Sequence, residues 1–475
     1  MSPVHVPYLW VVKDFDPFDG AEPRLSMRGW KAPPFDLELK GENHMKNRSG
    51  ILFAGVLIAA ISFTSVRPVF PWPTVYPRGV TLCKLDSVEP GYILLAPDAP
   101  GRGTVLIDNL TGNILKEWKY SGKPAKLLPN GNIFLYEKES SPGLRVYYYG
   151  DLTEFDWEGK KVWQWKGEIP GRQPVTSPFH HDFFRMENGN TLVLAMDKVK
   201  RPEISDKELM DDTFYEVTSD GRVVWELKTV DLYDQFGFTR EQRKLIFNQT
   251  GVFDSDWAHS NDLTILPPNK WFDQGDPRFK PGNLLTSFRD LNVVCIIERD
   301  AKKIVWKLGS NYPDGTIDQI IGQHDAHMIP KGLPGEGNIL IFDNGGEAGY
   351  PRKIRGYSRV IEVNPVKKEI VWKYEAVAWG QRLTQQGHFF SNYVGNAQRL
   401  PNGNTFIVEG WPGRLFEVTQ QGEIVWEWLS PWVPEPPTSP PGALNYIYRA
   451  YKYPRDYCPQ FKGLKPIAKH GGASF

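Results

Sequence analysis

The sequence has no excess of charge of either sign and little cysteine. Lysine plus arginine number 56, as do aspartate plus glutamate, so the overall charge does not predict binding to nucleic acid or to an anionic lipid surface. Three cysteines, Cys83, Cys295 and Cys458, are too few for a disulfide scaffold or a cysteine-cluster zinc site. Cys295 lies in an apolar run and is predicted to be buried, whereas Cys83 and Cys458 fit a disulfide and two free thiols equally well.

The short motifs of several enzyme classes are also missing. The sequence has no P-loop, no dinucleotide fingerprint, no G-x-S-x-G elbow and no H-E-x-x-H helix. These absences disfavour nucleotide-dependent chemistry, an α/β-hydrolase and a zinc peptidase.

Long apolar runs are missing with one exception, residues 50–66 (GILFAGVLIAAISFTSV). The run is at the short end of the roughly 17–25 residues that span a bilayer. More lysines and arginines precede it than follow it, which favours an amino terminus in the cytoplasm. We therefore expect a single-pass inner-membrane protein whose bulk lies on the periplasmic or other extracytoplasmic side.

The region 45–70 is assigned to this transmembrane anchor or signal segment. Read from Met45 it also fits a secretory signal, but no convincing A-x-A cleavage site follows, so a retained anchor helix is favoured over cleavage. Residues 1–44 show no clear period. They are either a cytoplasmic tail or an extension upstream of a true start at Met45.

What the sequence has is a repeat. Glycine (44), proline (40) and 13% aromatic residues favour many short strands over a helical bundle. Each unit begins with an apolar strand, a polar turn and a strand that ends near tryptophan; these first halves are 104–118, 152–165, 214–227, 293–308, 359–374 and 414–428. The second halves carry a turn such as Asn-Gly-Asn before another apolar strand, in 129–136, 187–195, 281–288, 336–343 and 401–409, with 89–97 supplying the sixth.

Units of two hairpins with a period near 50 are typical of propeller blades. The sequence thus predicts an all-β protein, a six-bladed β-propeller over residues 71–442, with an N-terminal membrane-anchor helix. We expect an amino-terminal strand to complete the last blade and so remove an open edge. The repeated tryptophans are predicted to pack between blades. Residues 443–475 are expected to be a C-terminal extension packed on the outside of the propeller.

Six of the nine histidines fall in the loops between the two halves of a blade; they are His180, His181, His259, His324, His327 and His388. Loops at one end of a propeller converge on its central channel, so these rings are predicted to face one another. Arginines recur after the second-half strands, at Arg289, Arg352, Arg355, Arg359 and Arg414. Imidazoles with guanidinium groups suit a small anion with several oxygens, such as a sulfuryl or phosphoryl group in transfer.

A lone histidine in such a loop is more often a hydrogen-bonded packing group, and that interpretation is kept for His180 and His388. His259 and His324 are favoured as functional because Asn and Asp accompany them at the same location. The pair His324 and His327 fits a metal less well, since no carboxylate or cysteine set completes a coordination sphere by spacing. Neither a metal nor a cofactor is expected.

Several stretches resemble the bacterial arylsulfotransferase family: HHD (180–182), DWAHSND (256–262), LLTSFRD (284–290), VVCIIERDAKKIVWKLG (293–309), QHDAH (323–327), and ILIFDNG (339–345) leading to YSRVIEV (357–363). The resemblance implies a six-bladed propeller that moves a sulfuryl group from one phenol to another without a nucleotide sulfate donor. It implies that His259 and His324 line the active site. Arg352, Arg355 and Arg359 compete for the family's arginine, and Arg352 is chosen.

The sequence departs from the family at one position. The family's nucleophilic histidine follows the strand that corresponds to NTFIVEG (404–410), where this chain continues with Trp411. Either another group such as His388 takes that role, or sulfuryl passes directly between donor and acceptor, or the protein acts on another ester or only binds.

The leading hypothesis is an arylsulfotransferase-like enzyme that acts on a phenolic sulfate and a phenolic acceptor. His324 is predicted to carry a proton or donate to an oxyanion, His259 to bind the sulfate and Arg352 to clamp it. Further substrate contacts are predicted for His181, Asn261, Arg289 and Trp411, with Trp379 and Phe390 also available for stacking. The alternatives are a non-catalytic, membrane-anchored propeller that serves as a binding or scaffold subunit of an envelope complex, and a metal-dependent propeller hydrolase.

Overall fold

The computed structural model describes residues 78–99, 101–137, 150–169, 179–249, 255–309, 319–375, 389–432 and 446–467. All of them belong to one compact unit, Thr74–Phe475. The predicted tail (1–44) and anchor (45–70), together with Trp379 and His388, lie outside the described residues. Within the described ranges, no helix is long and apolar enough to cross a membrane.

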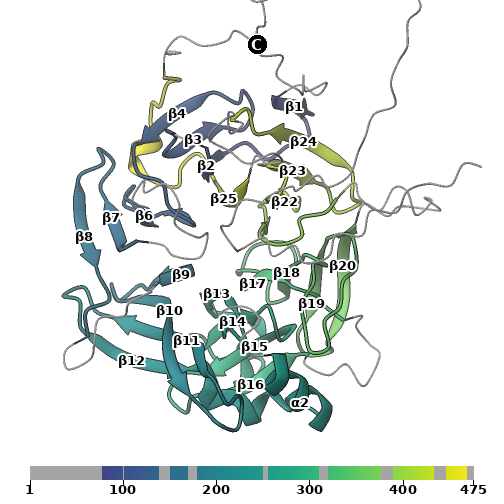
Figure 1. The fold of residues 1–475 in the computed structure, drawn as a ribbon. Helices are drawn as coiled ribbons and strands as arrows, with labels where there is room; N and C mark the ends of the chain where they lie inside the picture. Colours follow the sequence, from purple (N-terminus) through teal and green to yellow (C-terminus); the bar gives the residue numbers. More distant parts are fainter. Residues whose placement is uncertain are drawn as a thin grey trace, which may run out of the picture. The chain divides into compact units, whose positions relative to one another are not determined.

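Six antiparallel sheets surround a common centre, which confirms the predicted six-bladed propeller (Figure 1). From the centre outward, blade 1 is β25 (Ile447–Tyr453), β2 (Tyr92–Pro97), β3 (Thr104–Asp108) and β4 (Ile114–Trp118). Blade 2 is β5 (Ala125–Leu127), β6 (Ile133–Tyr136), β7 (Leu152–Phe155) and β8 (Lys161–Trp165). Blade 3 is β9 (Phe179–Arg185), β10 (Thr191–Lys200), β11 (Glu208–Val217) and β12 (Val223–Lys228).

Blade 4 is β13 (Ser260–Ile265), β14 (Leu284–Phe288), β15 (Val293–Glu298) and β16 (Lys303–Leu308). Blade 5 is β17 (His324–Met328), β18 (Ile339–Asp343), β19 (Arg359–Asn364) and β20 (Glu369–Glu375). Blade 6 is β21 (Asn396–Arg399), β22 (Thr405–Glu409), β23 (Arg414–Val418) and β24 (Ile424–Leu429), with β1 (Gly79–Cys83) as a fifth, outermost strand. The described helices are short: η1 (Thr229–Phe236), α2 (Arg240–Gln249), α3 (Lys270–Asp273), η2 (Pro277–Phe279) and η4 (Pro459–Phe461).

The repeated tryptophans join each blade to the next, as predicted. Every one of their indole N–H groups donates a hydrogen bond of 2.6–3.0 Å to a main-chain carbonyl in a turn of the neighbouring blade. The donor and acceptor pairs are Trp118 with Trp157, Trp163 with Ser219, Trp225 with Arg299, Trp306 with Pro365, Trp372 with Gln420, and Trp426 with Asn109. A large apolar ring that also satisfies a carbonyl explains why tryptophan recurs at this position.

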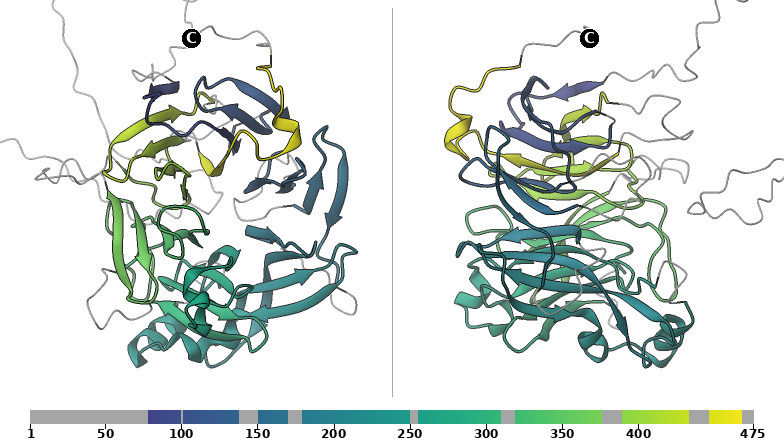
Figure 2. Two further views of the ribbon diagram at one scale, coloured as in Figure 1. Left: turned by 180° about the vertical axis from the view of Figure 1, so that it is seen from behind. Right: turned by 60° about the vertical axis from the view of Figure 1, so that its left-hand side comes forward.

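The two ends of the folded unit close the ring on different blades. β1 pairs with β24 and adds a fifth, outermost strand to blade 6. The strand expected to complete the last blade, 89–97, instead forms β2 in blade 1, where it pairs with β3. β25 pairs with β2 and forms the innermost strand of blade 1 (Figure 2). The prediction that the propeller ends at residue 442 and that residues 443–475 pack on its outside is therefore wrong. Without β25, the edge of β2 would be left unpaired at the centre of the molecule.

The cysteines are all free thiols. Cys295 is fully buried in blade 4, as predicted, while Cys83 lies on β1 and Cys458 lies just before η4. The sequence left open a disulfide between Cys83 and Cys458 or two free thiols, and the structure has two free thiols.

Candidate functional site

The innermost strands of blades 3, 4 and 5 are irregular at their histidines. The pairing register shifts between Val193 and Ala195 opposite β9, between Ser260 and Asp262 in β13, and between His324 and His327 in β17. Each irregularity has a residue with a left-handed backbone: φ is 59° at His181, 53° at His259 and 52° at Asp325. Bulges of this kind redirect side chains, and they are over-represented next to active sites.

The redirected imidazoles come together, as predicted, although His180 and His181 lie on strand β9 and His324 on strand β17, and not in loops between two halves of a blade. His180 Nδ1 is 2.7 Å from His181 Nδ1, and the rings of His181 and His259 lie edge to face with their centroids 4.7 Å apart. Burial, and then the proximity of His259, His180 and His324, lowers the pKa of His181 well below its usual value. Three blades therefore contribute imidazole rings to one cluster.

His259 is held by an aspartate in its own loop. Its ring Nδ1 lies 2.5 Å from Asp256 Oδ2, and its main-chain N–H donates to Asp256 Oδ1 at 3.0 Å. A carboxylate accepts the Nδ1 proton, so the lone pair of the neutral ring is on Nε2. The side chain is 15% exposed, whereas those of His180 and His181 are almost fully buried. His259 is thus the imidazole of the cluster best placed to meet a ligand.

His324 has partners on both ring nitrogens. Nδ1 faces two acceptors, Asn344 Oδ1 at 2.7 Å and the Gly322 carbonyl at 3.1 Å, so it carries the proton. The N–H of Val394 points at Nε2 from 3.4 Å. Burial and Arg289 lower the pKa of His324 well below its usual value, against the opposing effect of Asn344. A proton-carrier role would require one of these contacts to break.

Two guanidinium groups lie beside His259. Arg289 pairs with Asp290 and donates to the Glu347 carbonyl at 3.0 Å, and Arg352 approaches the same Asp290 carboxylate at 3.2 Å. Burial alone would raise the pKa of Asp290, but Arg289, Arg352 and His259 outweigh it and lower that pKa. Two cations share the Asp290 carboxylate, and a second carboxylate, that of Asp256, is bound to His259, so the charges around this imidazole are balanced in number.

The competing arginines lie elsewhere. Arg355 and Arg359 both bind the carboxylate of Asp343, at 2.9 and 2.7 Å. Arg352 is therefore the member of the three that binds Asp290, the carboxylate whose pKa His259 also lowers. Its role in binding substrate stays a prediction.

An aromatic group borders the histidines. Trp411 and Tyr393 lie edge to face with ring centroids 4.4 Å apart, and both pack on a buried cluster of Val394, Tyr446 and Tyr448. That cluster reaches His181, since Tyr448 Oη donates to the His181 main-chain carbonyl at 3.0 Å and the centroids of the two rings are 6.0 Å apart. Trp411 and Tyr393 are partly exposed. Trp411 thus contributes to an aromatic wall at the position where the family's histidine was expected.

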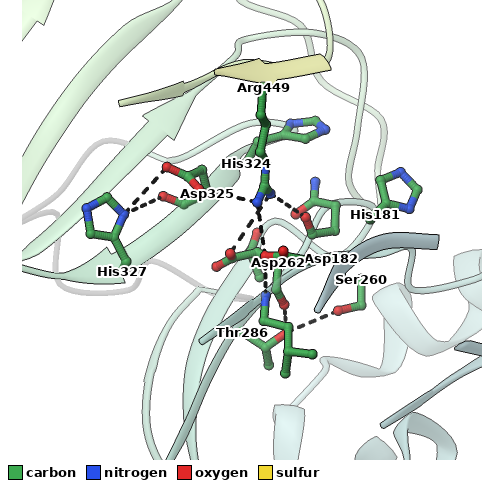
Figure 3. Close-up of polar contacts among 12 residues, drawn as sticks. His181, Asp182, Ser260, Asp262, Thr286, His324, Asp325, His327 and Arg449 are labelled. Atoms are coloured by element: carbon green, nitrogen blue, oxygen red, sulfur yellow. Dashed lines mark hydrogen bonds and ion pairs between the residues drawn. The ribbon is translucent and has the colours of Figure 1, made fainter. Parts of the chain in front are cut away.

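Figure 3 shows the centre of the ring, where Arg449 on β25 reaches across to other blades. Its guanidinium donates to Asp182 Oδ2 at 2.9 Å and to the Asn261 carbonyl at 2.7 Å, and lies 3.3 Å from Asp325 Oδ1. Burial raises the pKa of the adjacent Asp262 well above its usual value, despite Arg449. Arg449 is 3% exposed, so this cluster is a buried support for the site.

Sequence reasoning missed Arg449 because it lies beyond the predicted end of the propeller. The signal that could have found it is a position shared by the innermost strands of four blades. On each of these strands, one residue pairs with the first residue of the second strand of the blade. The residue four positions before it is His181, Asn261, His324 or Arg449. The Asn261 amide itself spans blades 4 and 5, donating to the Gln323 carbonyl at 2.8 Å. His327 does not join the cluster. It lies on the opposite side of Arg449 from His181, and its Nδ1 contacts the carbonyl and the carboxylate of Asp325 (Figure 3).

No group of three or more His, Cys, Asp or Glu side chains among the described residues is arranged to hold a metal ion. The chemistry that the site offers from its own residues is anion binding, nucleophilic attack and proton transfer by imidazole.

A model of the family described as Arylsulfotransferase (ASST) matches residues 124–430. The chain belongs to this arylsulfotransferase family. The match covers blades 2 to 6 with the histidine cluster, and it ends before β25 and Arg449. A search of curated proteins found no significant match to the sequence.

Solved structures share the propeller fold at low identity. A protein of unknown function from Bacteroides caccae is 12% identical with a TM-score of 0.44, covering 77% of this chain and 99% of that one. Virginiamycin B lyase from Staphylococcus aureus is 10% identical (TM-score 0.36; 74% and 89% covered), and so is a β-propeller domain from Myceliophteria thermophila (0.36; 75% and 91%). Likeness at this level carries no argument about activity.

Proposed function

We propose that this arylsulfotransferase-family protein transfers a sulfuryl group from a phenolic sulfate ester to a phenolic acceptor. The observation that carries the proposal is His259, oriented by Asp256 and flanked by Arg289 and Arg352, which share Asp290. A sulfate ester presents anionic oxygens for the guanidinium groups and an electrophilic sulfur for the imidazole.

His259 is the proposed nucleophile in place of the missing last-blade histidine. In the first half-reaction, the Nε2 lone pair forms a bond to sulfur while the bond from sulfur to the phenolic oxygen breaks. In the second half-reaction, the acceptor's oxygen attacks sulfur and the bond to Nε2 breaks. Asp256 stabilises the positive charge on the ring when Nε2 is substituted, since its carboxylate accepts the Nδ1 proton.

The aromatic wall is the proposed contact for the aryl group. Tyr393 and Trp411 are partly exposed and adjoin His324 through Val394, so a ring stacked there would hold its ester oxygen near the imidazoles. Replacing the expected histidine with tryptophan at this position exchanges a reactive group for a binding surface.

The test is release of a chromogenic phenol from its sulfate ester in the presence of a second phenol. We expect His259→Ala to abolish release and a His259→Ala/His324→Ala double variant to be no worse. His327→Ala, a ring outside the cluster, is the matched control and should keep the activity. Equal rates in wild type and in the double variant would remove the catalytic claim.

The covalent step has its own readout. Protein mixed with donor alone should gain one sulfuryl group, and peptide mapping should find it on the peptide with His259. Label on another histidine would reassign the nucleophile. Turnover that requires both phenols bound, with no label at all, would point to direct transfer.

A binding role is the second candidate, and Trp411 at the position of the expected nucleophile is the observation that favours it. It predicts a stoichiometric partner recovered from membranes with wild type and with the double variant alike, and no phenol release from either.

We further propose that residues 50–66 anchor the protein in the inner membrane with the propeller on the extracytoplasmic side. Wild type should fractionate with membranes and be accessible to protease in spheroplasts. A variant lacking 45–70 that still sediments with membranes would contradict the anchor.

A further inference from the structure

Behind His181 lies a row of polar groups that the sulfuryl transfer described above does not use. His180 Nδ1 is 2.7 Å from His181 Nδ1, and His180 Nε2 is 3.3 Å from Asp212 Oδ1. His180 is 2% exposed and Asp212 is 1% exposed. Within the described part of the chain, neither Asp212 Oδ1 nor His180 Nε2 makes a hydrogen bond, so two unsatisfied buried polar atoms lie 3.3 Å apart.

The proton positions in this row follow from the donors around it. The main-chain N–H of Ser260 donates to Asp212 Oδ2 at 2.6 Å, so a neutral Asp212 carries its proton on Oδ1 and presents it to His180 Nε2. The contact between the two Nδ1 atoms holds one proton, because one nitrogen must donate and the other accept. Protonation of Asp212 therefore sets which nitrogen of His181 carries a proton.

We propose that Asp212, His180 and His181 form a proton relay that moves the phenolic proton in both halves of sulfuryl transfer. The proposal rests on the proposed function. In the first half-reaction the departing phenolate oxygen takes the proton from His181 Nε2. In the same concerted movement His181 Nδ1 takes the proton of His180 Nδ1, and His180 Nε2 takes that of Asp212 Oδ1, which becomes a carboxylate.

The second half-reaction runs the row backwards. The acceptor's hydroxyl proton passes to His181 Nε2, the single Nδ1 proton returns to His180, and His180 Nε2 gives its proton back to Asp212. These transfers accompany formation of the bond from the phenolic oxygen to sulfur and cleavage of the sulfur–nitrogen bond. Each imidazole is neutral before and after each step, so no buried imidazolium has to accumulate.

The surroundings favour this starting state. Burial, and then the carboxylate of Asp256, raises the pKa of Asp212 well above its usual value, against the Ser260 hydrogen bond. Burial and His259 lower the pKa of His180 to about 3, opposed by the main-chain carbonyl of Ala195, which accepts a hydrogen bond from the ring. The titratable and charged groups that face the row are Asp211, Asp256, His259, Asp290, His324 and Arg449.

The kinetic test uses Asp212→Asn in the full-length protein. The amide matches the neutral acid in shape and hydrogen bonds, with its oxygen on the Ser260 N–H and its N–H toward His180, yet it cannot release the proton. We expect kcat to fall by about 100-fold with KM and thermal midpoint unchanged. His180→Phe should cost as much, and the double variant should be no slower than the slower single one, as for groups that act as a unit.

Asp211→Asn is the matched control. It makes the same chemical change at the residue before Asp212 on β11, whose carboxylate accepts from Trp257 Nε1 at 2.9 Å and from the main-chain N–H of Val230 at 3.2 Å. This control should keep kcat while losing stability. An unchanged kcat in Asp212→Asn, or losses that multiply in the double variant, would overturn the relay.

A second readout needs no substrate. Imidazole ¹⁵N shifts of His181 in the full-length protein in detergent, assigned with His181→Asn, should show the proton on Nε2 and its transfer to Nδ1 as rising pH ionises Asp212. In Asp212→Asn the proton should stay on Nε2. If wild type and Asp212→Asn differ in this way but the protein shows no sulfuryl transfer, the relay is supported and only the proposed function is contradicted. The same pH response in both proteins would overturn the relay itself.

Discussion

Arg449 and Asp182 form an ion pair of 2.9 Å between the first and third blades, with both side chains 1% exposed. Replacing Arg449 with methionine leaves the Asp182 carboxylate buried without this partner. We expect the free energy of unfolding to fall by roughly 3–5 kcal/mol, the usual cost of breaking a buried pair from one side. Denaturant unfolding measures it.

The control for this prediction is Arg455→Met, on the same terminal segment. Arg455 pairs with Asp108 at 3.4 Å, and its side chain is 46% exposed. Its loss should cost at most about 1 kcal/mol. Equal costs at the two arginines would mean that the central cluster does not hold the blades together.

Truncation of the chain after residue 442 tests ring closure. It removes β25, so we expect exposed apolar surface on blade 1, aggregation and loss of the cooperative thermal transition. Ending the chain after Ile467 retains every described strand and should behave as wild type. A monomeric, cooperatively folded product of the shorter truncation would show that β25 is dispensable.

Asp256→Asn tests the orientation of His259. The amide can present an N–H to Nδ1 and so move the ring proton to Nε2, which removes the nucleophilic lone pair. We expect kcat for phenol release to fall by about 100-fold with little change in KM. A change confined to KM would instead assign Asp256 to substrate binding.

The stability of the protein should depend on the ionisation of Asp211. Burial raises the pKa of Asp211 to about 7, against hydrogen bonds from Trp257 and Val230. The folded state therefore holds a proton that the unfolded chain releases near pH 4, so this group's contribution is greatest at low pH. It is lost as the pH rises toward 7, at up to about 1.4 kcal/mol per pH unit.

Asp211→Asn should remove that slope, because an amide does not ionise. The measurement is urea unfolding of both proteins across pH 4 to 8. The gap between wild type and variant should narrow as the pH rises. Parallel curves would show that Asp211 ionises normally in the folded state.

The inter-blade tryptophans should differ in cost. Trp426 is fully buried and donates to Asn109 at 2.6 Å, whereas the bond from Trp163 to Ser219 is exposed. Trp426→Phe leaves a buried carbonyl unpaired and should cost about 1–3 kcal/mol, and Trp163→Phe less. Thermal unfolding of the two variants compares them, and a larger loss for Trp163 would contradict the packing argument.

The sequence by itself determined the number of blades, the tryptophans that join them and the meeting of histidines from different blades. These features follow from local patterns: strand alternation, turn residues and equivalent loop positions are visible one unit at a time. The predicted cluster of His181, His259 and His324 has the same origin, since equivalent positions in a closed ring face its axis.

Only the tertiary structure decided how the ring closes and which side chains support the site. β25 lacks the turn signature of the repeat, and Arg449 contacts Asp182 and Asp325 through space at long sequence separation. The row from Asp212 through His180 was hidden for the same reason: polar groups on separate strands are brought within 3.3 Å by a bulge, whose position depends on pairing with a neighbouring strand. Such contacts exist only once the sheets have packed.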